Sequence, residues 1–105
     1  MGRFVIASYT PKPGREADLA ALVSKHMGVL RAEGLVTERP AYAMRAKDGT
    51  ILEVFEWLSA EAVEAAHTNA SVMELWGEFG EVCDFRPLAG LAECEGMFAE
   101  FEPIP

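Results

Sequence analysis

Basic residues, cysteines and long apolar runs are all scarce in this chain, and each shortage narrows the possible functions. Among 105 residues, 9 are Lys or Arg and 17 are Asp or Glu, so the formal net charge is −8. Because phosphate binding needs a positive surface, this balance argues against a nucleic-acid partner and an anionic membrane surface. No apolar run approaches the ~18 residues that span a bilayer, so we expect no membrane segment.

The two cysteines, Cys83 and Cys94, are too few for a disulfide scaffold or a thiolate zinc site. We therefore expect free thiols in a cytoplasmic protein. Residues 1–7 contain one basic residue and a short apolar run, which is too short for a secretory signal. Ile6 stands where N-myristoylation needs Ser or Thr, so we expect no lipid anchor there.

Motifs that hold nucleotides, metals or activated nucleophiles are also missing. The chain has no phosphate loop, no Gly-x-Gly-x-x-Gly after a strand and no Gly-x-Ser-x-Gly elbow. His-x-x-x-His and Cys-x-x-Cys spacings are absent, and no histidine completes a metal site with the glutamates of the helices. If the chain is an enzyme, we expect it to use no metal, flavin or nucleotide cofactor.

The hydrophobic pattern of the first half predicts a strand, a helix and a hairpin. Residues 3–10 are rich in β-branched and aromatic types, and residues 19–30 repeat apolar side chains at helical spacing. Gly34 follows the last helical turn and is placed to cap it in the left-handed conformation. Strands are expected at 41–46 and 50–58, joined by a turn at Lys47-Asp48-Gly49.

The second half predicts a broken helix and a final strand. Ser59 is a good N-cap, and helix propensity drops around residues 68–71, where we expect a break. A second helical stripe then runs from Val72 to Cys83, and Arg86-Pro87 ends it. Residues 93–102 alternate between the two faces and are expected to form the last strand.

The order β-α-β-β-α-β over a single domain, residues 1–105, predicts an α+β fold of ferredoxin-like type. In that plan two helices cover one face of a four-stranded antiparallel sheet. The strand at 50–58 carries large apolar groups on both faces, so something besides the helices must cover the second face. We therefore expect a homodimer packed through the open sheet face as a dimeric α+β barrel.

The only two histidines, His26 and His67, both lie on apolar helix stripes that are expected to face the sheet. Two inward imidazoles would form a polar spot in an apolar cavity, as in many small-molecule sites, and imidazole carries protons near neutral pH. The alternative is that each is a core histidine satisfied by a backbone carbonyl or a buried tyrosine.

Aromatic residues are candidates to line the same cavity and to stack on an aromatic ligand, although each is also an ordinary core residue. They are Tyr9, Tyr42, Trp57 and Trp76. Arg45 is expected to pair across the hairpin with Glu53 or Glu56.

Almost the whole chain resembles the antibiotic biosynthesis monooxygenase family, within the dimeric α+β barrel superfamily. The resemblance rests on residues 7–16 leading into the first helix, on Glu53-Val54-Phe55-Glu56-Trp57, and on Ala66-His67 in the second helix. It implies a homodimer with a pocket between helices and sheet. Some members of the family oxidise phenols or quinols with molecular oxygen and no cofactor, while others degrade haem. The haem-degrading branch is unlike this chain, because strand one has no asparagine here.

The resemblance also implies a mechanism, in which His67 helps to deprotonate a phenol or hydroquinone held against Trp76 and Phe79. In this interpretation His67 is catalytic, and Tyr9, His26, Trp57, Trp76 and Phe79 bind the substrate. A histidine expected a few residues beyond His67 in the family is missing, because that stretch reads Ala70-Ser71-Val72-Met73. The competing hypothesis is a non-catalytic homodimer of the same fold that binds a small ligand or is purely structural.

Overall fold

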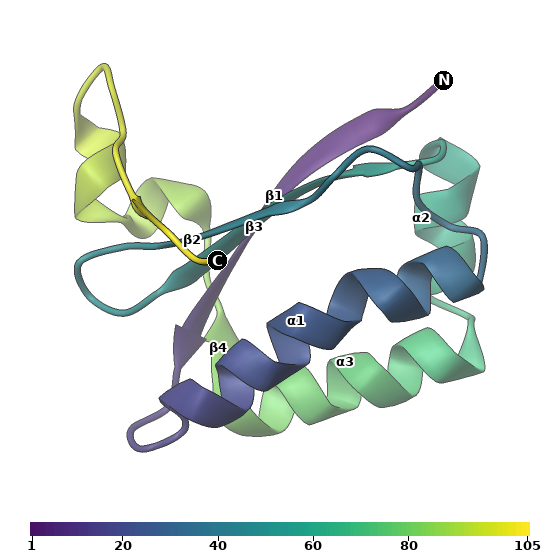
Figure 1. Ribbon diagram of the computed structural model, residues 1–105, viewed down its shortest axis with the longest axis horizontal. Helices are drawn as coiled ribbons and strands as arrows, with labels where there is room; N and C mark the ends of the chain where they lie inside the picture. The colour runs from purple at the N-terminus through teal and green to yellow at the C-terminus, as the bar shows by residue number, and fades with distance from the viewer.

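Five antiparallel strands form one sheet, and α1 and α3 lie side by side along one of its faces (Figure 1). The structure is a computed structural model that describes residues 1–105. The strand order across the sheet is β4-β1-β3-β2-β5. In chain order the elements are β1 (Arg3–Pro11), α1 (Glu16–Ala32), β2 (Tyr42–Arg45), β3 (Ile51–Trp57), α2 (Ala60–Ala66), α3 (Ala70–Val82), β4 (Cys83–Phe85), the 3₁₀ helices η1 (Leu88–Gly90) and η2 (Ala92–Glu95), and β5 (Glu102–Pro103).

This architecture confirms the α+β class and is consistent with a ferredoxin-like fold, although the sheet has five strands where the sequence predicts four. Helix α1 ends at Ala32, and Gly34 adopts the predicted left-handed conformation two residues later, with φ +70°. The Gly34 amide donates to the Arg31 carbonyl, and the Leu35 amide donates to the Leu30 carbonyl, both at 3.0 Å. These two bonds form a Schellman motif, and Leu30 and Leu35 share the core cluster below it.

The turn between β2 and β3 and the break in the second helix are both confirmed. Gly49 has φ +93°, and the Asp48 side chain accepts from the Thr50 amide at 2.9 Å. The Ser59 hydroxyl caps α2 by accepting from the Ala62 amide at 3.1 Å. Asn69 caps α3 by accepting from the Val72 amide at 3.1 Å. A new helix therefore begins where the helix propensity of the sequence is low.

The predicted last strand at residues 93–102 is wrong. The edge strand beside β1 is instead β4, which starts directly at the end of α3 and aligns Phe85 with Tyr9. The following segment folds into η1 and η2 on the face of the sheet away from α1 and α3, where Leu91 packs on Leu52 and Ala46. Alternation over residues 93–102 was a weak signal, because it carried too few β-branched residues to specify a strand.

The C-terminal segment covers only part of the second sheet face. Leu52 is fully buried beneath it, so this side chain needs no partner subunit. Phe4, Ile6 and Tyr42 remain exposed farther along the same face. No helix has both the length and the apolar character needed to cross a membrane.

Two glycine substitutions, one within α1 and one just after it, should have opposite effects on stability. Neither Gly28 nor Gly34 has a neighbour within 4 Å of an added Cβ, so the backbone decides both outcomes. Gly34→Ala should lower the free energy of unfolding by about 1 kcal/mol, because alanine avoids positive φ. Gly28→Ala should raise it by up to about 1 kcal/mol through helix propensity. Urea unfolding measures both values, and equal shifts of the same sign would contradict the assigned cap.

Candidate functional site

Four side chains from four different elements form one hydrogen-bonded chain inside the helix–sheet layer. The Tyr9 hydroxyl on β1 donates to Glu53 Oε1 on β3 at 2.9 Å. His26 Nδ1 on α1 lies 2.7 Å from the same oxygen, and Trp76 Nε1 on α3 donates to His26 Nε2 at 3.0 Å. We call these four residues the buried network.

Strand register and helix periodicity bring the network together. Glu53 lies between Ile51 and Phe55 on the face of β3 that α1 and α3 cover, and Ala7 is its direct partner on β1. Tyr9 is the diagonal neighbour of Glu53, within reach for a long side chain. His26 belongs to the buried stripe of α1, so its imidazole points down onto the sheet.

The hydrogen bonds fix which nitrogen of His26 carries a proton. An indole N–H is a donor only, so His26 Nε2 must be the acceptor in the bond from Trp76. The imidazole is then neutral, with its proton on Nδ1, and it donates to Glu53 Oε1. Glu53 is only 2% exposed, and a buried carboxylate requires such donors to offset the loss of its hydration.

Burial and the neighbouring Glu53 carboxylate both raise the pKa of Tyr9, burial being the larger cause. The phenol therefore remains a protonated donor to Glu53. Burial also raises the pKa of the Cys83 thiol to about 11, with a smaller effect from Asp84. Cys83 and Cys94 are both free thiols, as the sequence predicts.

An apolar cavity of about 330 Å³ lies beside the buried network and is within the size range of small-molecule sites. We call it the aromatic pocket, because most of its lining consists of rings. It is lined by Val5, Ala7, Tyr9, His26, Phe55, Trp57, Trp76 and Phe85.

The structure brings together most of the predicted binding residues. Tyr9, His26, Trp57 and Trp76 all line the aromatic pocket. Phe79 does not line it. This ring is fully buried and packs against Tyr9 and His26, with ring centroids 5.0 and 5.3 Å away.

Three sequence-based placements are wrong. Tyr42 is exposed on the opposite sheet face, because it shares the register of Val54. His67 does not face inward: α2 ends at Ala66, and His67 is its exposed C-cap, with Nδ1 2.8 Å from the Val63 carbonyl oxygen. The His67 ring touches the site only through Trp76. The two rings are packed edge to face, with their centroids 5.2 Å apart. Arg45 makes no ion pair, and Glu56 pairs with Arg39 instead.

Glu53 is the site residue that the sequence reasoning missed. Its position midway between Ile51 and Phe55 places it on the buried face of the strand by alternation alone. That pattern is a usable signal, because a buried carboxylate needs a partner and the apolar stripe of residues 19–30 directs His26 into the same layer.

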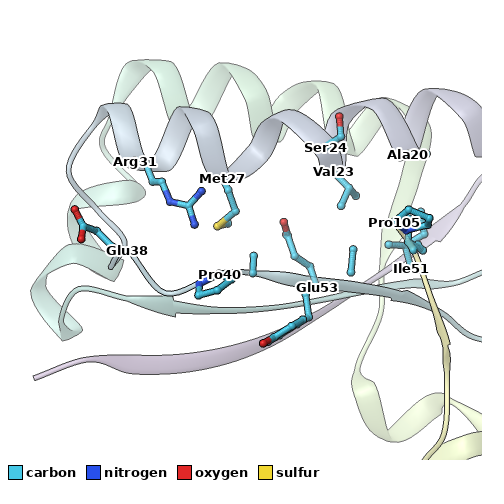
Figure 2. Close-up of a pocket in the computed structure, with 14 residues that line it drawn as sticks. Ala20, Val23, Ser24, Met27, Arg31, Glu38, Pro40, Ile51, Glu53 and Pro105 are labelled. Carbon is cyan, nitrogen blue, oxygen red and sulfur yellow. The ribbon is translucent and has the colours of Figure 1, made fainter.

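A second and larger cavity of about 530 Å³ lies on the other side of Glu53, between α1 and β2 (Figure 2). We call it the α1–β2 cleft. It is lined by Ala20, Val23, Ser24, Met27, Arg31, Glu38, Pro40, Ala41, Tyr42, Ala43, Ile51, Glu53, Ile104 and Pro105. Glu53 lines this cleft, whereas its hydrogen-bond partners Tyr9 and His26 line the aromatic pocket.

No three or more His, Cys, Asp or Glu side chains come close enough together to hold a metal ion. Comparisons with protein-family models, curated proteins and solved structures found no match for this chain. The function must therefore be argued from the site itself.

Removing the Tyr9 hydroxyl should destabilise the fold. Tyr9→Phe leaves Glu53 Oε1 with a single donor, so the free energy of unfolding should fall by about 1–3 kcal/mol. Tyr42→Phe is the matched control, and its exposed hydroxyl should matter by less than about 0.5 kcal/mol. Equal effects in chemical denaturation would contradict the buried network.

Alkaline titration should leave Tyr9 un-ionised for as long as the protein is folded. Because its pKa is raised in the folded state, the stability it contributes is complete below pH ~10 and is lost as the pH rises further. Tyrosinate absorbance of wild type and Tyr9→Phe should therefore rise equally until unfolding begins. A smaller folded-state rise in Tyr9→Phe would show that Tyr9 ionises in place.

Proposed function

We propose that this chain is a cofactor-independent monooxygenase that oxidises a small phenol in the aromatic pocket. One observation carries the proposal: a buried imidazole, held by a buried carboxylate, forms part of the wall of an apolar cavity lined with rings. Orientation of an imidazole by a carboxylate is how many general bases are kept in the right tautomer.

The proton transfer begins at His26 Nε2, the nitrogen without a proton. In the free protein the Trp76 N–H occupies this nitrogen, so a bound phenol replaces the indole as the donor. Trp76 is half-buried, and rotation of its ring would open the way. The phenol proton then moves to Nε2, and the imidazolium is stabilised by Glu53 through the Nδ1–H bond.

The phenolate and O₂ supply all the electrons and atoms that the oxidation needs. The anion passes one electron to O₂, and the radical pair combines to form a C–O bond at the para carbon. The peroxide takes the proton from His26, and loss of the para hydrogen as a proton expels hydroxide as the O–O bond breaks. A phenol and O₂ thus give a quinone and water, and a dry, apolar pocket favours these steps.

The family resemblance supports this proposal, and we extend it to membership of the antibiotic biosynthesis monooxygenase family. The exposed Phe4, Ile6 and Tyr42 suit a sheet-to-sheet homodimer of the dimeric α+β barrel type. A cytoplasmic location agrees with the two free thiols. In this proposal His26 is the base, and His67 contacts only the edge of the Trp76 ring.

A non-catalytic role is the second candidate, because every donor of the buried network already has an acceptor within it. Trp76 already donates to His26, and Tyr9 and His26 already donate to Glu53. The sole role of a hydrogen-bond network whose donors are all used can be to specify a single packing of the core. In that case the chain is a small-ligand-binding or structural homodimer of the same fold.

Oxygen uptake with a panel of phenols that carry a hydrogen at the para carbon, polycyclic phenols among them, distinguishes the two candidates. Wild type should consume O₂ in the presence of a chelator, and His26→Gln should lose about 10²- to 10⁴-fold in rate, the usual contribution of a general base. His67→Ala is the matched control and should stay within a few fold of wild type.

Circular dichroism of each variant separates lost chemistry from lost folding. A folded His26→Gln at full rate, or loss of turnover in His67→Ala alone, would reject His26 as the base, and the second result would favour the sequence-based choice of His67. No uptake by wild type across the panel would favour the non-catalytic role.

A further inference from the structure

We propose that the α1–β2 cleft is a second binding site, which takes a free amino acid with an apolar side chain. Only one of the two Glu53 carboxylate oxygens has hydrogen-bond partners within the chain. Oε1 accepts from both Tyr9 and His26, whereas no hydrogen bond involves Oε2. Glu53 is 2% exposed, and its side chain rises from β3 into the cleft toward α1 (Figure 2).

A carboxylate oxygen in this position calls for a donor from a ligand. Buried polar atoms in folded proteins are nearly always hydrogen-bonded. Ser8 Oγ is the only fully buried side-chain polar atom without a partner, so Glu53 Oε2 remains reachable from the cleft. An ammonium group supplies several N–H donors, and it adds a positive charge beside a carboxylate that has only neutral donors.

One end of the cleft carries a positive charge, and Glu53 lies nearer the middle (Figure 2). The Arg31 side chain descends from the last turn of α1 into the space above the sheet, near Met27 (Figure 2). One of its nitrogens, Nη2, donates to the Arg39 carbonyl at 3.1 Å, and Arg31 forms no ion pair, even with Glu38 on the rim. The rest of the guanidinium fork is free to bind a carboxylate.

On the side of Glu53 away from Arg31 the cleft wall is apolar (Figure 2). Val23 lines this part from α1 and Ile51 lines it from the sheet, and Met27, Ala43 and Ile104 also line the cleft. The cleft therefore offers an acceptor, a guanidinium and an apolar wall, which match the ammonium, carboxylate and side chain of an apolar amino acid. At about 530 Å³ it is within the range of small-molecule sites.

This site is independent of the proposed oxygenase activity, because its occupancy needs no turnover. The test is an amide ¹H–¹⁵N NMR titration of the full chain with L-leucine, L-methionine, L-phenylalanine and L-tryptophan. At least one should bind with a Kd of about 1 mM or tighter. Its shifts should centre on Met27, Ala43 and Ile104, the cleft residues, and not on the aromatic pocket.

Matched half-ligands and matched variants test the two charges separately. 2-Phenylethylamine and 3-phenylpropionate each lack one charge of phenylalanine and should bind about tenfold more weakly. Arg31→Met should weaken amino-acid binding by about tenfold, whereas Arg45→Met, which changes an exposed arginine outside the cleft, should leave it unchanged. Glu53→Gln should weaken the binding of 2-phenylethylamine but not of 3-phenylpropionate.

The proposal is overturned if none of the four amino acids shifts the cleft residues. It is also overturned if Arg31→Met binds as tightly as wild type. Because Arg31 is exposed, this variant keeps the test decisive even where Glu53→Gln fails to fold.

Discussion

The buried carboxylate of Glu53 is the constraint on which the rest of the helix–sheet layer depends. A carboxylate in an apolar layer is tolerated only where donors replace the water it has lost. Tyr9 and His26 supply them, and Trp76 then holds His26 in a single tautomer. These bonds tie β1, α1 and α3 to the central strand β3 at one point, so removal of any member leaves another polar group buried without its partner.

The same constraint organises the two cavities. On one side of the buried network lies the aromatic pocket, whose lining includes the ring of His26. On the other side lies the α1–β2 cleft, where the second oxygen of Glu53 has no partner within the chain. One acidic residue thus serves both proposals, as the anchor of a base in the pocket and as a direct ligand contact in the cleft.

Local signals in the sequence predicted most of the fold. Turns and helix caps are fixed by the local chemistry of a few residues, which are Gly34, Asp48-Gly49, Ser59 and Asn69. The helices and strands next to these residues could therefore be found without tertiary information. β4 could not be found in this way, because three residues at the end of a helical stripe carry no period of their own. Pairing with β1 alone makes this segment a strand.

The site was predictable as a set of residue types but not as a geometry. Helical spacing placed His26 inward correctly. It placed His67 wrongly, because α2 ends at Ala66, one residue before His67. The alternation of side chains along β3 places Glu53 on the buried face. The role of Glu53, however, depends on Tyr9 and His26, which lie 44 and 27 residues away in the chain. Contacts at such separations follow from register and packing, which a single sequence does not display.

The tautomer of His26 tests the account most directly. Long-range ¹H–¹⁵N NMR of the imidazole ring at neutral pH reports which nitrogen carries the proton. The hydrogen bonds from Trp76 and to Glu53 predict a neutral ring with the proton on Nδ1 and none on Nε2. A proton on Nε2 would contradict the buried network, and with it the base proposed for the aromatic pocket.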